Sequence, residues 1–292
     1  MGEARARGVP VGSRLERLLR HAWSAMTNPN SSDEAVPQKF YKYRSVSGRA
    51  GDFAMRIICD HEIYFPPPSS FNDPFDCRPA FSFDVSDEEL LADYIRMAKK
   101  HGPPMSEQEL REDALQMLAD PARNPKNLGV CAAIQDRHSD VITKTVGVLC
   151  VSTVRDDILM WSHYADSHQG ICLQFDGLGK LMAHAQKVVY SENRRFIRMP
   201  GDDNETSMEK ALLTKSNHWD YEQEWRLIAY KNGPGVQKFR PENLTGIIFG
   251  ARASAETQKS VRGWIATHPT PIKIYQARVN RFKYTLDIEE LG

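Results

Sequence analysis

Strand-like segments recur along this chain at irregular intervals, and helical segments of unequal length lie between them. Residues 147–153, GVLCVST, are apolar almost throughout, which is typical of a strand buried on both faces. The other predicted strands cover residues 39–44, 62–65, 170–175, 187–190, 222–230, 246–249 and 273–279. Strands that come singly or in pairs, without regular βαβ alternation, favour an α+β fold with a mixed, largely antiparallel sheet and flanking helices.

Residues 84–145 predict a helical insertion. Ser86 and Ser106 each precede a glutamate by three residues, which is the capping-box pattern at the start of a helix. Further helices are predicted over residues 47–60, 130–144, 157–165, 207–217 and 255–267, with Ser47 and Asp156 as caps. We therefore expect one α+β domain over residues 37–292 that carries the insertion, preceded by a flexible N-terminal extension over residues 1–36.

The composition gives no overall charge that would attract a polyanion. Lys plus Arg and Asp plus Glu each number 38, so the formal net charge is zero, and nothing in the total favours nucleic acid or an anionic membrane. No apolar run approaches the ~20 residues needed to span a bilayer. The five cysteines include no C-x-x-C pair, which is typical of reduced thiols. The sequence predicts a cytoplasmic protein without a membrane partner.

Two acidic residues and an arginine alternate in the segment Glu222-x-Glu224-x-Arg226. In a strand over residues 222–230, these three side chains share one face. Neighbouring carboxylates repel each other, which raises the pKa of a carboxyl group unless a nearby cation compensates the negative charge. Two interpretations stay open: an active site that uses the carboxylates, or a structural ion pair with Arg226.

Three other clusters carry polar groups that suit a ligand, although each also has a structural explanation. Tyr43 and Arg44 end the first strand, where Arg44 offers a planar cation for phosphate or is an ordinary surface residue. Asn72 lies in FNDPFD, which is also turn chemistry. Ser152 and Thr153 end a buried strand, where hydroxyls meet ligands or cap the next element.

The predicted helix over residues 157–165 contributes Trp161, His163 and Tyr164 as candidates. A core or interface histidine is the more common alternative for His163. His163 and His168 are five residues apart, so they do not form the i, i+4 metal pair of a zinc helix. The chain also lacks the glycine-rich phosphate loops and the serine hydrolase elbow. No metal site is predicted.

The motifs K-Y-R, F-N-D-P-F-D, W-S-H-Y-A-D-x-H-x-G and Y-E-x-E-W-R occur in this order. In these motifs the chain resembles the bacterial family known as domain of unknown function 2971. The resemblance extends from about Phe40 to Phe249. The family name itself assigns no reaction.

A looser resemblance, to mono-ADP-ribosyltransferases, rests on Arg44, Ser152-Thr153 and Glu222-x-Glu224, again in order. It implies that Arg44 binds the phosphates of NAD and that Ser152-Thr153 braces the nicotinamide pocket. Glu224 would be the catalytic residue, stabilising an oxocarbenium-like transition state, and Glu222 would orient or deprotonate the acceptor. The Ser-Thr-Val sequence lacks the final serine usual in these enzymes, and the helical insertion precedes it.

The resulting hypothesis is an ADP-ribosyltransferase-like enzyme that uses NAD as its substrate, as a bacterial toxin or defence effector. Its acceptor would be a protein or a nucleic acid. Glu224, Glu222 and His163 would be catalytic. The expected NAD-binding residues are Arg44, Tyr43, Ser152, Thr153, Trp161, Tyr164 and Asn72.

Two alternatives stay open. The first is a metal-dependent nucleic-acid hydrolase that uses Asp73, Asp76, His163 and Glu224. The second is a non-enzymatic module in which the aromatic residues and Arg44 bind a ligand.

Overall fold

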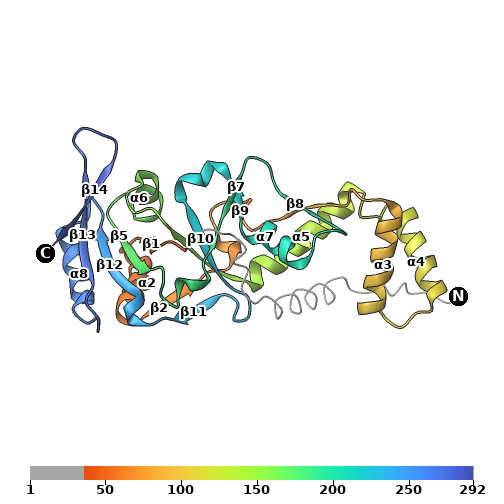
Figure 1. The fold of residues 1–292 in the computed structure, drawn as a ribbon, viewed down its shortest axis with the longest axis horizontal. Helices are drawn as coiled ribbons and strands as arrows, with labels where there is room; N and C mark the ends of the chain where they lie inside the picture. The colour runs from red at the N-terminus through yellow and green to blue at the C-terminus, as the bar shows by residue number, and fades with distance from the viewer. Residues whose placement is uncertain (1–35, 292) are drawn as a thin grey trace. The chain divides into compact units, whose positions relative to one another are not determined.

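The computed structural model describes residues 36–291, which form two compact units. Unit 1 comprises residues 71–144 and 193–214, and unit 2 comprises residues 36–70, 145–192 and 215–291. The predicted α+β class is confirmed (Figure 1). Residues 193–214 belong to a unit that begins more than 100 residues earlier, and the single domain over residues 37–292 stays a prediction. The predicted extension over residues 1–36 lies outside the described residues except for its last position.

Unit 2 is built around an eight-stranded sheet with the order β14-β13-β12-β5-β1-β4-β10-β6. The parallel pair in this sheet is β12 and β13, and its other neighbours are antiparallel. The strands are β1 (Lys39–Arg44), β4 (Gly147–Ser152), β5 (Ile171–Asp176), β6 (Gln186–Lys187), β10 (Glu224–Ala229), β12 (Leu244–Phe249), β13 (Lys273–Val279) and β14 (Leu286–Leu291). A separate antiparallel pair joins β2 (Glu62–Phe65) to β11 (Gly235–Lys238).

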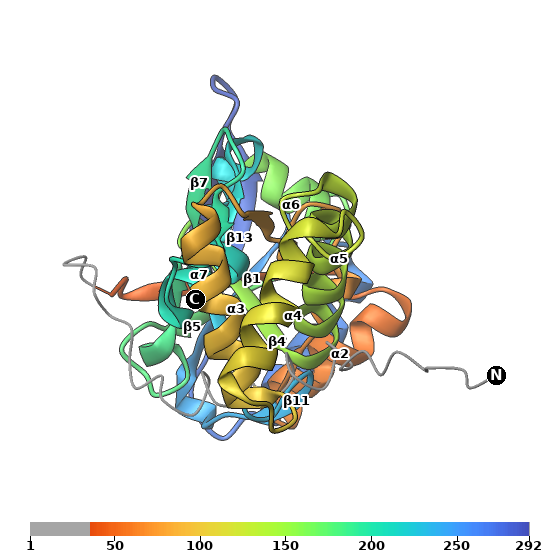
Figure 2. The same ribbon diagram turned by 90° about the vertical axis from the view of Figure 1, so that its right-hand side faces the viewer.

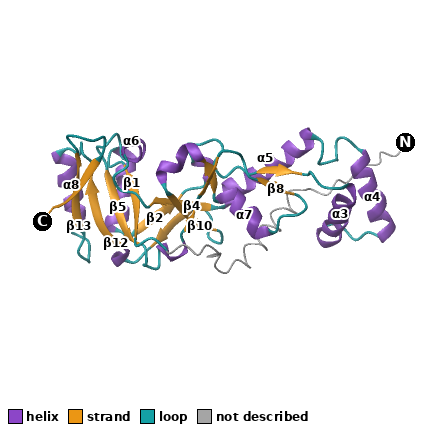
Figure 3. Cartoon of the chain, turned by 45° about the horizontal axis from the view of Figure 1, so that its top comes forward, coloured by secondary structure: helices purple, strands orange, loops and turns teal. Residues whose placement is uncertain are grey.

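The two faces of this sheet pack in separate hydrophobic cores, because side chains alternate along each strand. On one face, Phe40 and Trp225 meet edge to face at 5.5 Å, and α2 (Gly48–Cys59) and α8 (Ala255–Ile265) contribute to this core. On the other, Tyr41 and Tyr43 pack against α6 (Ile158–Tyr164). Figure 3 shows α6 and α8 beside the strands of the sheet. The central strands are therefore buried on both sides, as predicted for residues 147–153.

Unit 1 contains the predicted helical segment. Its helices are α3 (Asp87–His101), α4 (Glu107–Ala119), α5 (Leu128–Thr145) and α7 (Asn204–Leu212), and it also holds the parallel pair β3 (Ala80–Ser82) and β8 (Phe196–Arg198). Both capping boxes, at Ser86 and Ser106, are confirmed. Figure 2 shows α3 and α4 side by side, and the Tyr94 hydroxyl of α3 donates to Asp113 of α4 at 2.6 Å.

Two predicted caps differ in detail. The carboxylate of Asp157, and not that of Asp156, accepts the backbone N–H groups of Leu159 and Met160 at 2.9 and 2.8 Å, so α6 begins one residue later. Ser47 precedes α2 as expected, but its hydroxyl donates to Asp166 at 2.9 Å and makes no cap hydrogen bond.

Two predicted elements near the site are divided. Residues 187–190 belong to two short strands, β6 and β7 (Val189–Ser191). The helix predicted over residues 207–217 ends at Leu212, and β9 (Thr214–Ser216) and the 3₁₀ helix η3 (Asn217–Glu222) follow. The interruption places Lys215 in an extended segment directly before η3.

Candidate functional site

Glu222 and Glu224 lie on different elements. Glu222 ends η3, and Gln223 has a left-handed backbone with φ of 43°, so the predicted strand over residues 222–230 begins only at Glu224. A left-handed non-glycine residue is uncommon, and here it turns the chain from the 3₁₀ helix into β10. The side-chain amide of Gln223 donates to the carbonyl of Asp220 at 2.7 Å, which holds this turn.

Lys215 nevertheless brings the two carboxylates together. Its Nζ lies 2.5 Å from Oε2 of Glu222 and 3.0 Å from Oε2 of Glu224. On the far side of Glu224, Arg226 donates from Nε to Oε1 at 2.8 Å and from Nη2 to Oε2 at 3.1 Å. All four side chains are buried, and Arg226 is 0% exposed. The predicted ion pair of Glu224 with Arg226 therefore exists, and Lys215 extends it to Glu222.

The surroundings move the pKa values of the two carboxylates in opposite directions. Burial raises the pKa of Glu222, and the charge of Glu224 adds to this rise against the opposing effect of Lys215. Burial also acts to raise the pKa of Glu224, but Arg226 and Lys215 outweigh it and hold that pKa well below its usual range. Glu224 is thus a fixed anion, whereas Glu222 is the carboxyl that can exchange a proton.

Tyr164 connects Glu222 to the outer part of the site. Its hydroxyl donates to Oε1 of Glu222 at 2.7 Å, and the residue is partly exposed at the end of α6. The second carboxylate oxygen is held by Lys215, so each Glu222 oxygen has one donor. A proton released by Glu222 therefore has a hydroxyl group directly beside it.

Aromatic rings surround this end of the cluster. The Nζ of Lys215 lies 4.9 Å from the centre of the Trp219 ring, in a cation–π contact. His163 is exposed and lies with its Nδ1 3.1 Å from the Tyr221 hydroxyl. Burial raises the pKa of Tyr221 to about 12, which keeps this phenol protonated at neutral pH. His163, Tyr164, Trp219 and Tyr221 together form the aromatic rim of the site.

Ser152 and Thr153 hold the backbone that carries the carboxylates. Ser152 pairs with Glu224 across β4 and β10, and its hydroxyl donates to the carbonyl of Glu222 at 2.6 Å. The same hydroxyl accepts the N–H of Val154 at 3.0 Å. The N–H of Thr153 donates to the carbonyl of Gln223 at 3.2 Å. The predicted bracing role is thus directed at the turn between η3 and β10.

Two further cations lie on β1, which neighbours β4. The Nζ of Lys42 donates to the carbonyl of Cys150 at 2.7 Å. Burial lowers the pKa of Lys42 to about 8, and the positive charge of Arg44 acts in the same direction. The Nε of Arg44 is buried and has no hydrogen-bond partner within residues 36–291. Glu222 and Glu224 act against this shift, so Lys42 lies within electrostatic range of the carboxylates.

Two predicted ligand-binding residues belong to the core instead. Trp161 is 0% exposed and donates from Nε1 to the carbonyl of Arg155 at 2.9 Å. The buried Tyr43 ring meets Trp161 edge to face at 5.2 Å, and the Tyr43 hydroxyl donates to the carbonyl of Val154 at 2.9 Å. The prediction that they stack on or bind a ligand is corrected, because neighbouring groups fill their apolar faces and satisfy their polar atoms.

Asn72 belongs to unit 1, so the cluster in unit 2 is described without it. The sequence did not identify Lys215 as part of the site, because Lys215 belongs to none of the quoted motifs. Lys42, in contrast, stands in the K-Y-R motif. A lysine nine residues before Glu224 has no recognisable spacing to it in the sequence. Only the interruption of the predicted helix by β9 brings it to the carboxylates.

Comparison with known proteins finds a similarity in part of this site. Residues 160–227 match the family described as "Protein of unknown function (DUF2971)". This segment contains Tyr164, Lys215 and both carboxylates, and it supports the resemblance in W-S-H-Y-A-D-x-H-x-G and Y-E-x-E-W-R. No curated protein and no solved structure matches the chain.

Residues 36–291 show neither a metal cluster nor a membrane-spanning helix. They contain no group of three or more His, Cys, Asp or Glu side chains placed to hold a metal ion. Within the same part of the chain, no helix combines the length and the apolar character that crossing a membrane requires.

Proposed function

We propose that unit 2 is an enzyme that breaks an N-glycosidic bond in NAD, with Glu222 as its acid–base group. The observation that carries this proposal is the pair of buried carboxylates bridged by Lys215, whose pKa values move apart. Two carboxylates in such different environments can divide the roles of proton exchange and fixed charge. Transfer of ADP-ribose to a protein or nucleic acid is the corresponding transferase reaction.

The roles within this proposal differ from those that the ADP-ribosyltransferase resemblance implies. Glu224 has both oxygens engaged by Arg226 and Lys215, which makes it a poor partner for a ribose hydroxyl. The charge of Glu224 instead favours the protonated form of Glu222. Glu222 accepts a hydrogen bond from Tyr164, which belongs to the aromatic rim. Glu222 therefore takes the central catalytic role, and Glu224 positions Lys215 and raises the pKa of Glu222.

An anionic substrate suits the two cations of β1, Lys42 and Arg44. Arg44 has a buried Nε without a hydrogen-bond partner in the described chain, and Lys42 lies beside it. Guanidinium groups bind phosphate through two parallel hydrogen bonds. Trp219 and Tyr221 are partly exposed and offer flat apolar faces to a nicotinamide ring.

The test is the conversion of NAD labelled in the nicotinamide ring by purified protein, followed as release of labelled nicotinamide. Glu222→Gln should abolish release, because the amide cannot exchange a proton, and it keeps the size of the side chain. Glu192→Gln is the matched control, since Glu192 is exposed in the same unit. Wild-type release that persists undiminished in Glu222→Gln contradicts the proposal.

A ligand-binding module without catalysis is the second candidate, and the ion-paired state of both carboxylates favours it. In that case the protein binds NAD without consuming it. Equilibrium dialysis with labelled NAD in the same preparations separates the two functions, because binding without release of nicotinamide supports the module.

A further inference from the structure

A cavity of about 510 Å³ lies in unit 2, and neither Glu222 nor Glu224 is among its lining residues. Its apolar lining comes from Phe65, Leu181, Leu227 and Phe239. Leu227 follows Arg226 on β10, so its side chain points to the opposite face of the sheet from the ion pair. A cavity of this size lies within the range of ~300–1,000 Å³ typical of small-molecule sites.

The polar lining of this cavity is basic. Lys180, His184, Lys238 and Arg240 line it, and no acidic side chain is among its lining residues. Within the described residues, Lys238 and Arg240 form long ion pairs, at 3.8 Å to Glu62 and 3.7 Å to Glu242. The cavity therefore favours a ligand that carries negative charge.

Asn243 supplies a polar group to the lining of this cavity. The residue is only 4% exposed. Gly179 makes room for its side-chain amide, because a Cβ there would lie 2.1 Å from Nδ2 of Asn243.

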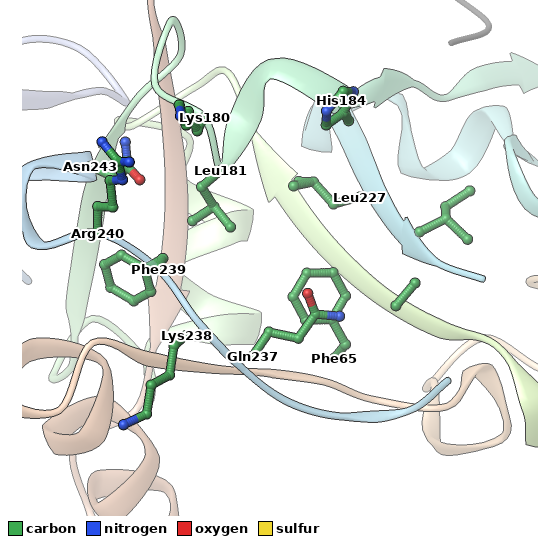
Figure 4. Close-up of a pocket in the computed structure, with 12 residues that line it drawn as sticks. Phe65, Lys180, Leu181, His184, Leu227, Gln237, Lys238, Phe239, Arg240 and Asn243 are labelled. Atoms are coloured by element: carbon green, nitrogen blue, oxygen red, sulfur yellow. The ribbon is translucent and has the colours of Figure 1, made fainter. Parts of the chain in front are cut away.

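Two of the four basic residues lie at the same end of the cavity as Asn243 (Figure 4). Figure 4 shows Lys180, Arg240 and Asn243 toward one end and Phe65 with Gln237 toward the other, with Leu181 and Phe239 between them. The N–H of Asn243 donates to the carbonyl of Arg240 at 2.9 Å, and Lys180 follows Gly179, so this end is one continuous group. Gln237 offers a second amide near the apolar end.

We infer that this cavity binds a nucleoside monophosphate. Its phosphate would lie between Lys180 and Arg240, and its base would lie on the apolar floor within reach of the amides of Asn243 and Gln237. Several cations suit the double charge of a phosphate, and Asn and Gln amides complement the donor and acceptor edges of a base. This site does not depend on the NAD reaction proposed above.

The probe is adenosine monophosphate, titrated into the full chain by calorimetry. Adenosine and inorganic phosphate each lack half of the ligand and should bind at least about tenfold more weakly, the loss expected of one charge-assisted hydrogen bond or more. The double variant Lys180→Ala/Arg240→Ala should lose at least as much affinity for adenosine monophosphate. Lys231→Ala, an exposed lysine outside the cavity, should bind like the wild type.

Gly179→Ala tests the role of Asn243 separately, because the added methyl displaces its amide while the charges stay. Gly179→Ala should weaken the binding of adenosine monophosphate. The affinity for inorganic phosphate that Lys180→Ala/Arg240→Ala removes should be lost to the same extent with or without Gly179→Ala. Circular dichroism confirms that each variant is folded. Glu222→Gln should bind adenosine monophosphate normally, so failure of the NAD reaction and failure of this site are distinguishable.

Three results would overturn the inference: no measurable binding of adenosine monophosphate, equal binding by Lys180→Ala/Arg240→Ala, or tighter binding of decanoate. The last result would assign the cavity to an apolar carboxylate.

Discussion

The hydroxyl of Ser152 donates a 2.6 Å hydrogen bond to the carbonyl of Glu222. One strand end thus fixes the backbone of the residue proposed as the acid–base group. The bond joins β4 to the last residue of η3, and the register of β4 with β10 places Ser152 opposite Glu224 as well.

Replacing Ser152 by alanine should lower the free energy of unfolding by about 1–3 kcal/mol, because it leaves the buried carbonyl of Glu222 without its donor. Urea unfolding followed by circular dichroism measures the change. Ser69→Ala is the control, because Ser69 is exposed in the same unit. A Ser152→Ala protein as stable as the wild type would show that this bond does not hold the turn.

Lys215→Met should destabilise unit 2 by about 3–5 kcal/mol, the cost of removing one partner from a buried ion pair. The two carboxylates would then face each other without the shared cation, which raises the pKa of Glu222 further. Urea unfolding at pH 7 measures the loss, and Lys231→Met serves as the exposed control. Recovery of stability in Lys215→Met as the pH is lowered toward 5 would support the repulsion as its cause.

Glu222 should make stability fall as pH rises above the ordinary glutamate value of 4.5. Its folded pKa is raised, so between 4.5 and that pKa the folded state binds more protons than the unfolded state. The stability contributed by this proton is complete below the unfolded pKa and is lost as pH rises through the folded one. Glu222→Gln should remove this fall, whereas Glu192→Gln should keep it, in urea unfolding between pH 4 and 8.

Lys42 has the opposite effect at alkaline pH. Its pKa is lowered from 10.5 to about 8, so between these values the unfolded state binds more protons and stability rises with pH. Subtracting the urea unfolding curve of Lys42→Met from that of the wild type isolates this contribution. A difference in unfolding free energy that stays constant from pH 7 to 10 would show that folding does not lower the pKa of Lys42.

The local part of this site could be predicted from the sequence. The period of two in a strand placed Glu224 and Arg226 on one face, and the strand ending at Ser152 was correctly located. Capping boxes at Ser86 and Ser106 were readable because each depends on four consecutive residues. The α+β class followed from the order of such local segments.

The long-range part was not readable. The turn at Gln223 is left-handed without a glycine to announce it, and Lys215 reaches the carboxylates only because a predicted helix ends early. Trp161 was assigned to a ligand because a large aromatic beside His163 suits either a site or a core. Which of the two applies depends on Tyr43, which lies more than 100 residues away in the chain.

The short helix η3 couples three groups that would otherwise be independent. It begins two residues after Lys215, contains Trp219 and ends at Glu222, and the Trp219 ring rests on the Lys215 ammonium. Any displacement of this one turn changes the ring, the cation and the carboxylate together. The pKa of Glu222 therefore depends on the position of η3. A ligand that contacts only Trp219 would change the pKa of this carboxyl group.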